Sequence, residues 1–203
     1  NLFGAPGVGK SSIAAGLYSK MKESHYSVEL CREYAKYLTI TDRNWQLEEE
    51  QLYLFAKQHH ELFILRGKYK FAITDSPLLL TSFYANPLTT PNSFHQCVTD
   101  YNNTFDNINV LVTRDLSAAA SVFENEGRIH DRAGSIKIQK EQPQFLEKNK
   151  VNYIHLELLE GRNNSLYLFE LLNEKGSNHR ITIVASQIPM DWEYNDNYTS
   201  PFA

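Results

Sequence analysis

The chain has 203 residues, of which 42% are hydrophobic and 22% are charged, and its net charge is -4. These proportions exclude a chain that is disordered throughout and predict one domain around one core. The charge does not favour a broad basic surface for duplex nucleic acid, although a local basic groove stays open. No apolar run is long enough to predict a membrane span. Two cysteines, Cys31 and Cys97, are too few for a disulfide framework, so we expect two buried thiols in a cytoplasmic protein.

The first informative segment is a glycine-rich loop that fits the pattern G-x-x-x-x-G-K-[ST] at every fixed position. Glycines allow backbone amides to approach phosphate oxygens, the lysine reaches the β- and γ-phosphates, and the serine ligates Mg²⁺. A helix predicted over residues 11–22 would aim its N-terminus at the phosphates. Only Leu2 and Phe3 precede the loop, and we expect their strand to begin before Asn1. We assign nucleotide binding to Gly4, Ala5, Pro6, Gly7, Val8, Gly9, Lys10, Ser11 and Ser12.

Short apolar runs alternate with helical patterns along the rest of the chain, which predicts an α/β fold. With the phosphate loop, this becomes a P-loop NTPase or kinase fold, a mostly parallel sheet flanked by helices. We expect one domain over residues 1–203, with its core at 1–156, an extension of the same domain at 157–185 and a tail at 186–203. The strands are predicted at 27–31, 71–76, 109–113, 153–156 and 181–185. The helices are predicted at 11–22, 33–38, 45–66, 77–85, 93–105, 116–124, 133–148 and 166–172, with Pro143 as a point where the helix could break.

Charged residues follow the predicted strands where open α/β sheets bind ligands. Asp75 ends one apolar strand and is suited to hold Mg²⁺ together with Ser11, and Glu33 follows another strand. The chain lacks the Asn-Lys-x-Asp segment of switch GTPases, and Asp75 is followed by Ser76 rather than by a water-activating glutamate. Both observations favour phosphoryl transfer to a substrate over hydrolysis. Arg128 and Arg132 lie where such kinases carry an arginine-bearing lid.

The ordered set of motifs resembles the small P-loop ATPase/kinase family of tailed bacteriophages. That family is similar to the ribosylnicotinamide kinase domain of bacterial NAD-regulator proteins and to phage kinases that phosphorylate 5-hydroxymethyluracil in DNA. The resemblance covers about residues 1–156. The segments that carry it are Gly4–Ser11, Glu33–Lys36, Phe55–Gln58, Ile73–Pro77 and Glu126–Arg128.

The resemblance implies a kinase that uses ATP and Mg²⁺ and phosphorylates a hydroxyl of a nucleoside-like or nucleotide acceptor, in the cytoplasm of a host if a phage encodes it. It implies catalytic roles for Lys10, Glu33, Asp75 and Arg128, with Glu33 as the general base and Arg132 as a second lid arginine. Asp75 could share the base role, and Glu33 could instead only cap a helix.

Two other functions stay open. One is a kinase for a modified base in DNA, for which Lys57, Arg66, Lys68 and Lys70 could form a basic groove. The other is a regulatory module that binds ATP without phosphorylating a small molecule. Gln58, inside one of the family-like segments, is a further candidate for a hydrogen bond to the acceptor.

Overall fold

The computed structural model describes residues 1–116 and 131–178. Its strands are β1 (Leu2–Phe3), β2 (Val28–Cys31), β3 (Phe71–Thr74), β4 (Val110–Thr113) and β5 (Ile154–Glu157). Its helices are α1 (Lys10–Glu23), α2 (Tyr34–Ile40), α3 (Asn44–Glu49), α4 (Gln51–Phe63), α5 (Leu79–Tyr84), α6 (Asn92–Asn102), α7 (Arg132–Lys148) and α8 (Asn164–Asn178). The predicted strands and helices in these ranges are present, with one exception described below.

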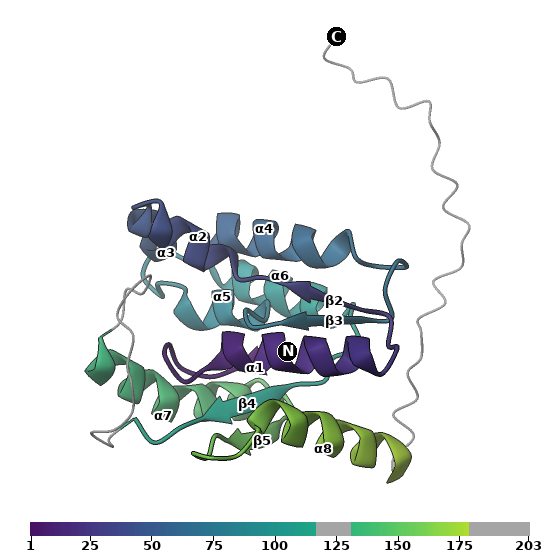
Figure 1. The fold of residues 1–203 in the computed structure, drawn as a ribbon. Coiled ribbons are helices and arrows are strands. Elements are labelled where there is room, and N and C mark those ends of the chain that lie inside the picture. The colour runs from purple at the N-terminus through teal and green to yellow at the C-terminus, as the bar shows by residue number, and fades with distance from the viewer. Residues whose placement is uncertain (117–130, 179–203) are drawn as a thin grey trace, which may run out of the picture.

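The strands form two parallel ladders, and helices lie on both sides of them (Figure 1). One ladder has the order β1-β4-β5, and the other joins β2 to β3. Successive residues of a strand face opposite hydrophobic clusters, because side chains alternate along a strand. Leu2 and Val110 lie in one cluster, while Phe3 and Leu111 lie in the other. The expected α/β fold with a parallel sheet flanked by helices is confirmed.

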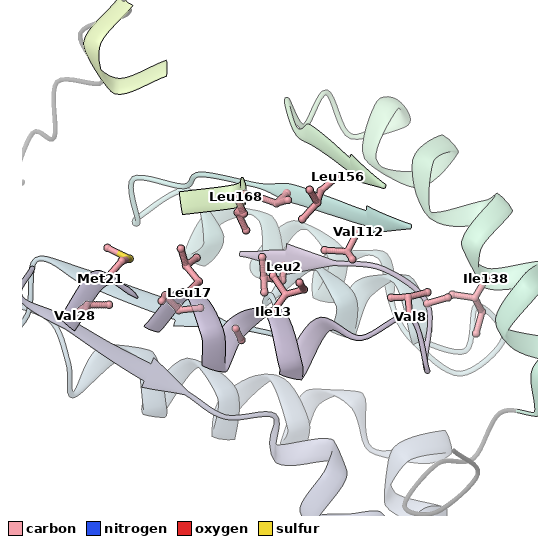
Figure 2. Close-up of a cluster of buried hydrophobic side chains, with 14 of the residues drawn as sticks. Leu2, Val8, Ile13, Leu17, Met21, Val28, Val112, Ile138, Leu156 and Leu168 are labelled. Atoms are coloured by element: carbon pink, nitrogen blue, oxygen red, sulfur yellow. The ribbon is translucent and has the colours of Figure 1, made fainter. Parts of the chain in front are cut away.

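The first hydrophobic cluster joins α1 and α8 to the strands (Figure 2). Ile13 and Leu17 of α1 are buried in it, and Leu168 of α8 is fully buried in the same cluster. Each such leucine contributes about 1.5–3 kcal/mol by its removal from water. Helix α8 is longer than the predicted 166–172, and it ties residues beyond the family-like region to the phosphate-loop helix.

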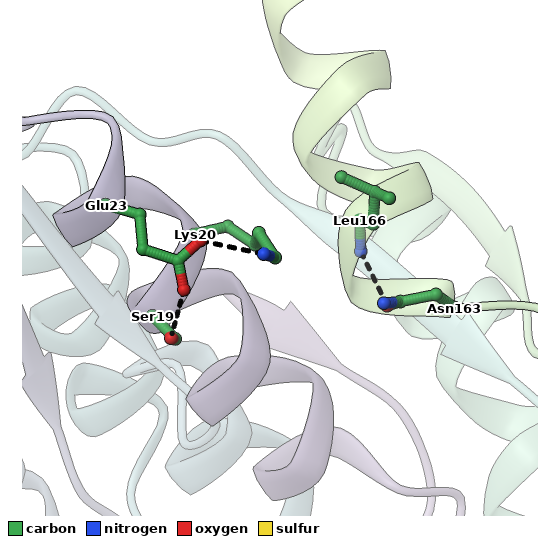
Figure 3. A network of polar contacts seen from close by, with 5 residues as sticks. All are labelled: Ser19, Lys20, Glu23, Asn163 and Leu166. Atoms are coloured by element: carbon green, nitrogen blue, oxygen red, sulfur yellow. Dashed lines mark hydrogen bonds and ion pairs between the residues drawn. The ribbon is translucent and has the colours of Figure 1, made fainter.

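The last turn of α1 and the first turn of α8 each carry local polar contacts (Figure 3). The backbone N–H of Leu166 donates to the Asn163 side chain at 3.0 Å, which caps α8 at its third residue. In the last turn of α1, Glu23 accepts from Lys20 at 2.7 Å and from Ser19 at 3.1 Å. These two hydrogen bonds lower the pKa of the Glu23 carboxyl group. The contact with Asn163 therefore fixes the start of α8.

One prediction about the helices is wrong: residues 45–66 form two helices, α3 and α4, rather than one. Glu50 lies between them with φ -117° and ψ 49°. The side chain of Gln51 donates to the Leu47 carbonyl at 2.5 Å, and so takes the acceptor that its own backbone N–H would use in a continuous helix. In contrast, α7 continues through Pro143. The predicted helix 116–124 (beyond Leu116), the predicted strand 181–185 and the tail lie outside the described residues.

The outer faces of α4 and α6 form an apolar groove of about 470 Å³, which contains none of the predicted site residues. Cys97 lines this groove and is half-buried, so the prediction that both thiols are buried holds for Cys31 alone. No helix in the described part of the chain is long and apolar enough to cross a membrane. The groove is lined by Leu52, Phe55, Ala56, His59, His60, Phe63, Cys97 and Tyr101.

Candidate active site

The predicted phosphate loop follows β1 and leads directly into α1. Gly4, Gly7 and Gly9 have φ values of 146°, 83° and 104°, which favour glycine. Gly9 is the N-cap of α1 in the left-handed region. A Cβ on Gly4 would lie 2.5 Å from the backbone oxygen of Val112, so β4 also requires glycine there. The loop conformation therefore depends on glycine at three of its positions.

The other residues of the loop divide into anchors and exposed groups. Ala5 and Val8 are fully buried, so their side chains anchor the loop to the hydrophobic core. Pro6 is half-buried, and Ser11 and Ser12 are exposed in the first turn of α1. The Lys10 ammonium group lies over the loop and donates to the carbonyls of Gly4 at 2.7 Å and Ala5 at 3.0 Å. The lysine is thus placed where phosphates would meet the loop.

Ser11 and Asp75 meet beside the loop, although 64 positions separate them in the sequence. The Ser11 hydroxyl donates to Oδ2 of Asp75 at 2.6 Å. Asp75 follows β3 directly and is 7% exposed. Mg²⁺ prefers oxygen ligands and commonly takes only one or two from the protein. A serine hydroxyl and a carboxylate at this distance fit that preference.

Glu33 lies after β2 as the N-cap residue of α2. Gln58 of α4 fixes the backbone on both sides of it. The Gln58 side chain donates to the Arg32 carbonyl at 3.3 Å and accepts from the Tyr34 N–H at 3.2 Å. Gln58 is buried and also contacts Cys31 and Thr74, so its amide is used inside the protein. The interpretation of Gln58 as an acceptor ligand is therefore replaced by a role in holding Glu33.

Two residues near Glu33 carry no sequence motif. Tyr84 is the last residue of α5, and burial raises the pKa of its hydroxyl group. The negative charge of Glu33 raises this pKa further, whereas a hydrogen bond from the Gln142 amide lowers it. Gln142 of α7 is fully buried and donates to the Gly4 carbonyl at 3.4 Å. The Gln142 amide thus connects Tyr84 with the phosphate loop, and the sequence did not indicate Gln142.

The two predicted lid arginines differ in what the structure shows. Arg128 lies outside the described residues. Arg132 is the first residue of α7, and its Nε donates to the Leu116 carbonyl at 2.6 Å, just beyond β4. Asp131 caps the same helix by accepting from the Gly134 N–H at 2.7 Å. Arg132 therefore lies at the edge of the sheet where the phosphate loop and Asp75 also lie.

The parallel strands, the flanking helices and the glycine-rich loop before α1 together make an α/β fold of the P-loop type. A solved structure of deoxyadenosine kinase from M. mycoides with bound dCTP is similar to the chain. It has a TM-score of 0.52 and 17% sequence identity over 85% of this chain and 97% of that chain. The chain therefore shares the fold of this structure.

A second structure of deoxyadenosine kinase from M. mycoides, with the products dCMP and dCDP bound, has 16% identity. It covers 88% of this chain and 98% of that chain, but its TM-score of 0.47 is too low to support an inference. No protein-family model and no curated protein sequence matches the chain.

Proposed function

We propose that the protein is an ATP- and Mg²⁺-dependent kinase that transfers the γ-phosphoryl group to a hydroxyl group of a nucleoside-like acceptor. The contact between Ser11 and Asp75 beside a glycine-rich loop is the observation that carries the proposal. The loop amides and Lys10 would bind the phosphates of ATP. Ser11 and Asp75 would hold Mg²⁺, which neutralises charge on the phosphates.

Glu33 is the better candidate for the general base. The Asp75 carboxylate already accepts a hydrogen bond from Ser11. A carboxylate that also ligates a metal ion is a poor base for the proton of the acceptor hydroxyl. Glu33 lies on a separate segment, after β2, where its position is fixed by Gln58. It would orient the acceptor hydroxyl and take its proton as the oxygen attacks phosphorus. Arg128 and Arg132 would stabilise the charge on the transferred group, with Arg128 as the main lid residue.

The acceptor is more consistent with a small molecule than with DNA. Two of the four basic residues considered for a DNA groove lie at different ends of the strands. The Lys57 ammonium group lies over the rings of Tyr34 and Tyr53 near Glu33. Lys70 precedes β3, where its N–H donates to the Ser27 carbonyl. Of these two charges, Lys57 alone lies near Glu33, which favours a small acceptor over a long polyanion.

The test is acceptor-dependent release of ADP, measured with Mg²⁺ and ATP over a panel of nucleosides, nucleotides, nicotinamide riboside and DNA containing hydroxymethyluracil. We expect a small nucleoside-like acceptor to stimulate ADP release. Lys10→Ala should abolish transfer and leave the fold intact, because the ammonium group lies over the carbonyls of the loop and is not part of either hydrophobic cluster. Lys20→Ala is the matched control, since Lys20 lies on the same helix with an exposed partner, Glu23.

The outcomes separate the alternatives. Stimulation by DNA alone, weakened by salt, would support the DNA kinase. ADP release that no acceptor changes would support the regulatory module and would leave Glu33 as a structural cap. Retained transfer in a folded Lys10→Ala variant would contradict the assignment of the phosphate loop.

A further inference from the structure

Gln142 is buried in a way that stability does not explain. Its side chain is 0% exposed, and its Oε1 has no hydrogen-bond partner among the described residues. A buried carbonyl oxygen without a partner loses the hydrogen bonds that it made with water, whereas an apolar side chain of similar size would lose none. Unpaired polar atoms in a core therefore call for another explanation. The place of the Gln142 amide beside the phosphate loop supplies one.

The amide shares its acceptor with Lys10. The Gly4 carbonyl accepts from Lys10 Nζ at 2.7 Å and from Gln142 Nε2 at 3.4 Å. Under the proposed function, Lys10 turns toward the phosphates of ATP, which weakens its contact with this carbonyl. Gln142 comes from α7, on the other side of the loop, and its donor stays in place when the lysine moves. The Gly4 carbonyl then keeps its hydrogen bond from Gln142 in the nucleotide-bound state, after Lys10 has turned away.

The same amide has a second partner, because it donates to the Tyr84 hydroxyl. The ring of Tyr84 packs against both hydrophobic clusters, which fixes its direction. The packed ring therefore gives the Gln142 amide a fixed partner besides the Gly4 carbonyl.

We propose that Gln142 is a positioning residue that holds the Gly4 carbonyl while Lys10 binds the donor phosphates. The inference rests on the proposed function, since it assumes that Lys10 binds phosphate. It assigns Gln142 to the donor half of the reaction, the binding of the nucleotide.

The test compares Gln142→Met with Ser135→Ala. Both residues lie on α7, both are fully buried, and both have an unpartnered polar atom, but in the described part of the chain no hydrogen bond joins the Ser135 hydroxyl to the loop. We expect Gln142→Met to raise the KM for ATP about two- to tenfold, the effect of one neutral hydrogen bond, without lowering Tm. The KM for the acceptor should stay within a factor of about two. Ser135→Ala should change neither constant.

A second variant is an internal control. Tyr84→Phe keeps the packed ring and leaves the contact of the Gln142 amide with the Gly4 carbonyl, so the KM for ATP should stay unchanged. An unchanged KM for ATP in Gln142→Met overturns the proposal. An unfolded Gln142→Met also overturns it, because the amide would then be needed for stability.

Binding of Mg·ATP, measured by calorimetry on the same proteins, separates this inference from the proposed function. If the wild-type protein binds Mg·ATP but phosphorylates no acceptor, the kinase assignment fails. In that case, the Kd of Gln142→Met for Mg·ATP, compared with the Kd of the wild-type protein, still tests the role of Gln142. A weaker Kd in Gln142→Met supports the donor half, and an equal Kd rejects it. If the wild-type protein does not bind Mg·ATP, both proposals are rejected.

Discussion

Substitution of Gly4 by alanine tests whether the phosphate loop is held by its approach to β4. The new Cβ would lie 2.5 Å from the Val112 backbone oxygen, and a backbone atom cannot rotate away as a side chain can. The φ of 146° adds strain for any residue with a Cβ. We expect about 1–3 kcal/mol from the backbone strain and a further 1–3 kcal/mol from the overlap.

The matched control is Gly67→Ala, because Gly67 also has a positive φ, 75°, but no atom lies within 4 Å of its expected Cβ. This control carries strain alone and should cost about 1 kcal/mol. For a chain of this length, each kcal/mol lowers Tm by about 2–4 °C, so Gly4→Ala should melt several degrees below Gly67→Ala. The assay is thermal unfolding followed by circular dichroism. Equal melting temperatures for the two variants would refute the reasoning about the approach to β4.

Three further predictions concern the site and the thiols. Asp75→Asn should reduce transfer about 10²-fold or more, because the amide carries no negative charge to bind Mg²⁺. The Tm should stay near normal, since the amide oxygen still accepts from Ser11. Activity within tenfold of the wild-type protein would contradict this. Glu33→Gln should reduce kcat about 10²–10⁴-fold and remove the acid limb of the pH profile, whereas a persistent limb would assign the base elsewhere. Burial raises the pKa of Cys31 to about 12, so at pH 8 a thiol reagent should modify half-buried Cys97 first and Cys31 only on unfolding. Because this pKa lies above that of an unfolded thiol, the protonated Cys31 favours the folded state at pH 9 and below, and stability should fall between about pH 9 and 12.

The phosphate loop could be predicted from the sequence because its chemistry is local. Its glycines, Lys10 and Ser11 lie within eight positions, and each is required by the way a backbone encloses phosphate. Asp75 could also be predicted from the sequence, since an acid that follows an apolar strand lies at the ligand-binding edge of a parallel sheet. The contact of Ser11 with Asp75 at 2.6 Å agrees with both predictions.

Gln142 could not be identified in this way. Gln142 lies 138 positions from Gly4, in the middle of a helix whose pattern gives no reason for a polar residue. Only the packing of α7 between the loop and α5 brings the amide to these partners. Gln58 shows the opposite error: it lies in a family-like segment, yet its hydrogen bonds are all satisfied within the protein around Arg32 and Tyr34. A motif indicates that a residue matters, but it does not indicate whether the residue contacts a ligand or supports one that does.

The separation of Asp75 from Glu33 follows from the register of β2 and β3. These strands are parallel, and Cys31 pairs with Thr74, so Asp75 leaves the sheet beside Arg32. Glu33 is one residue further along and starts α2, whereas Asp75 stays at the edge of the sheet and meets Ser11. A carboxylate at the edge can serve a metal at the phosphates, and a carboxylate beyond it can reach a second substrate. The ladder thus places two acids at different depths of the candidate site, as the proposed transfer between two bound molecules would use them.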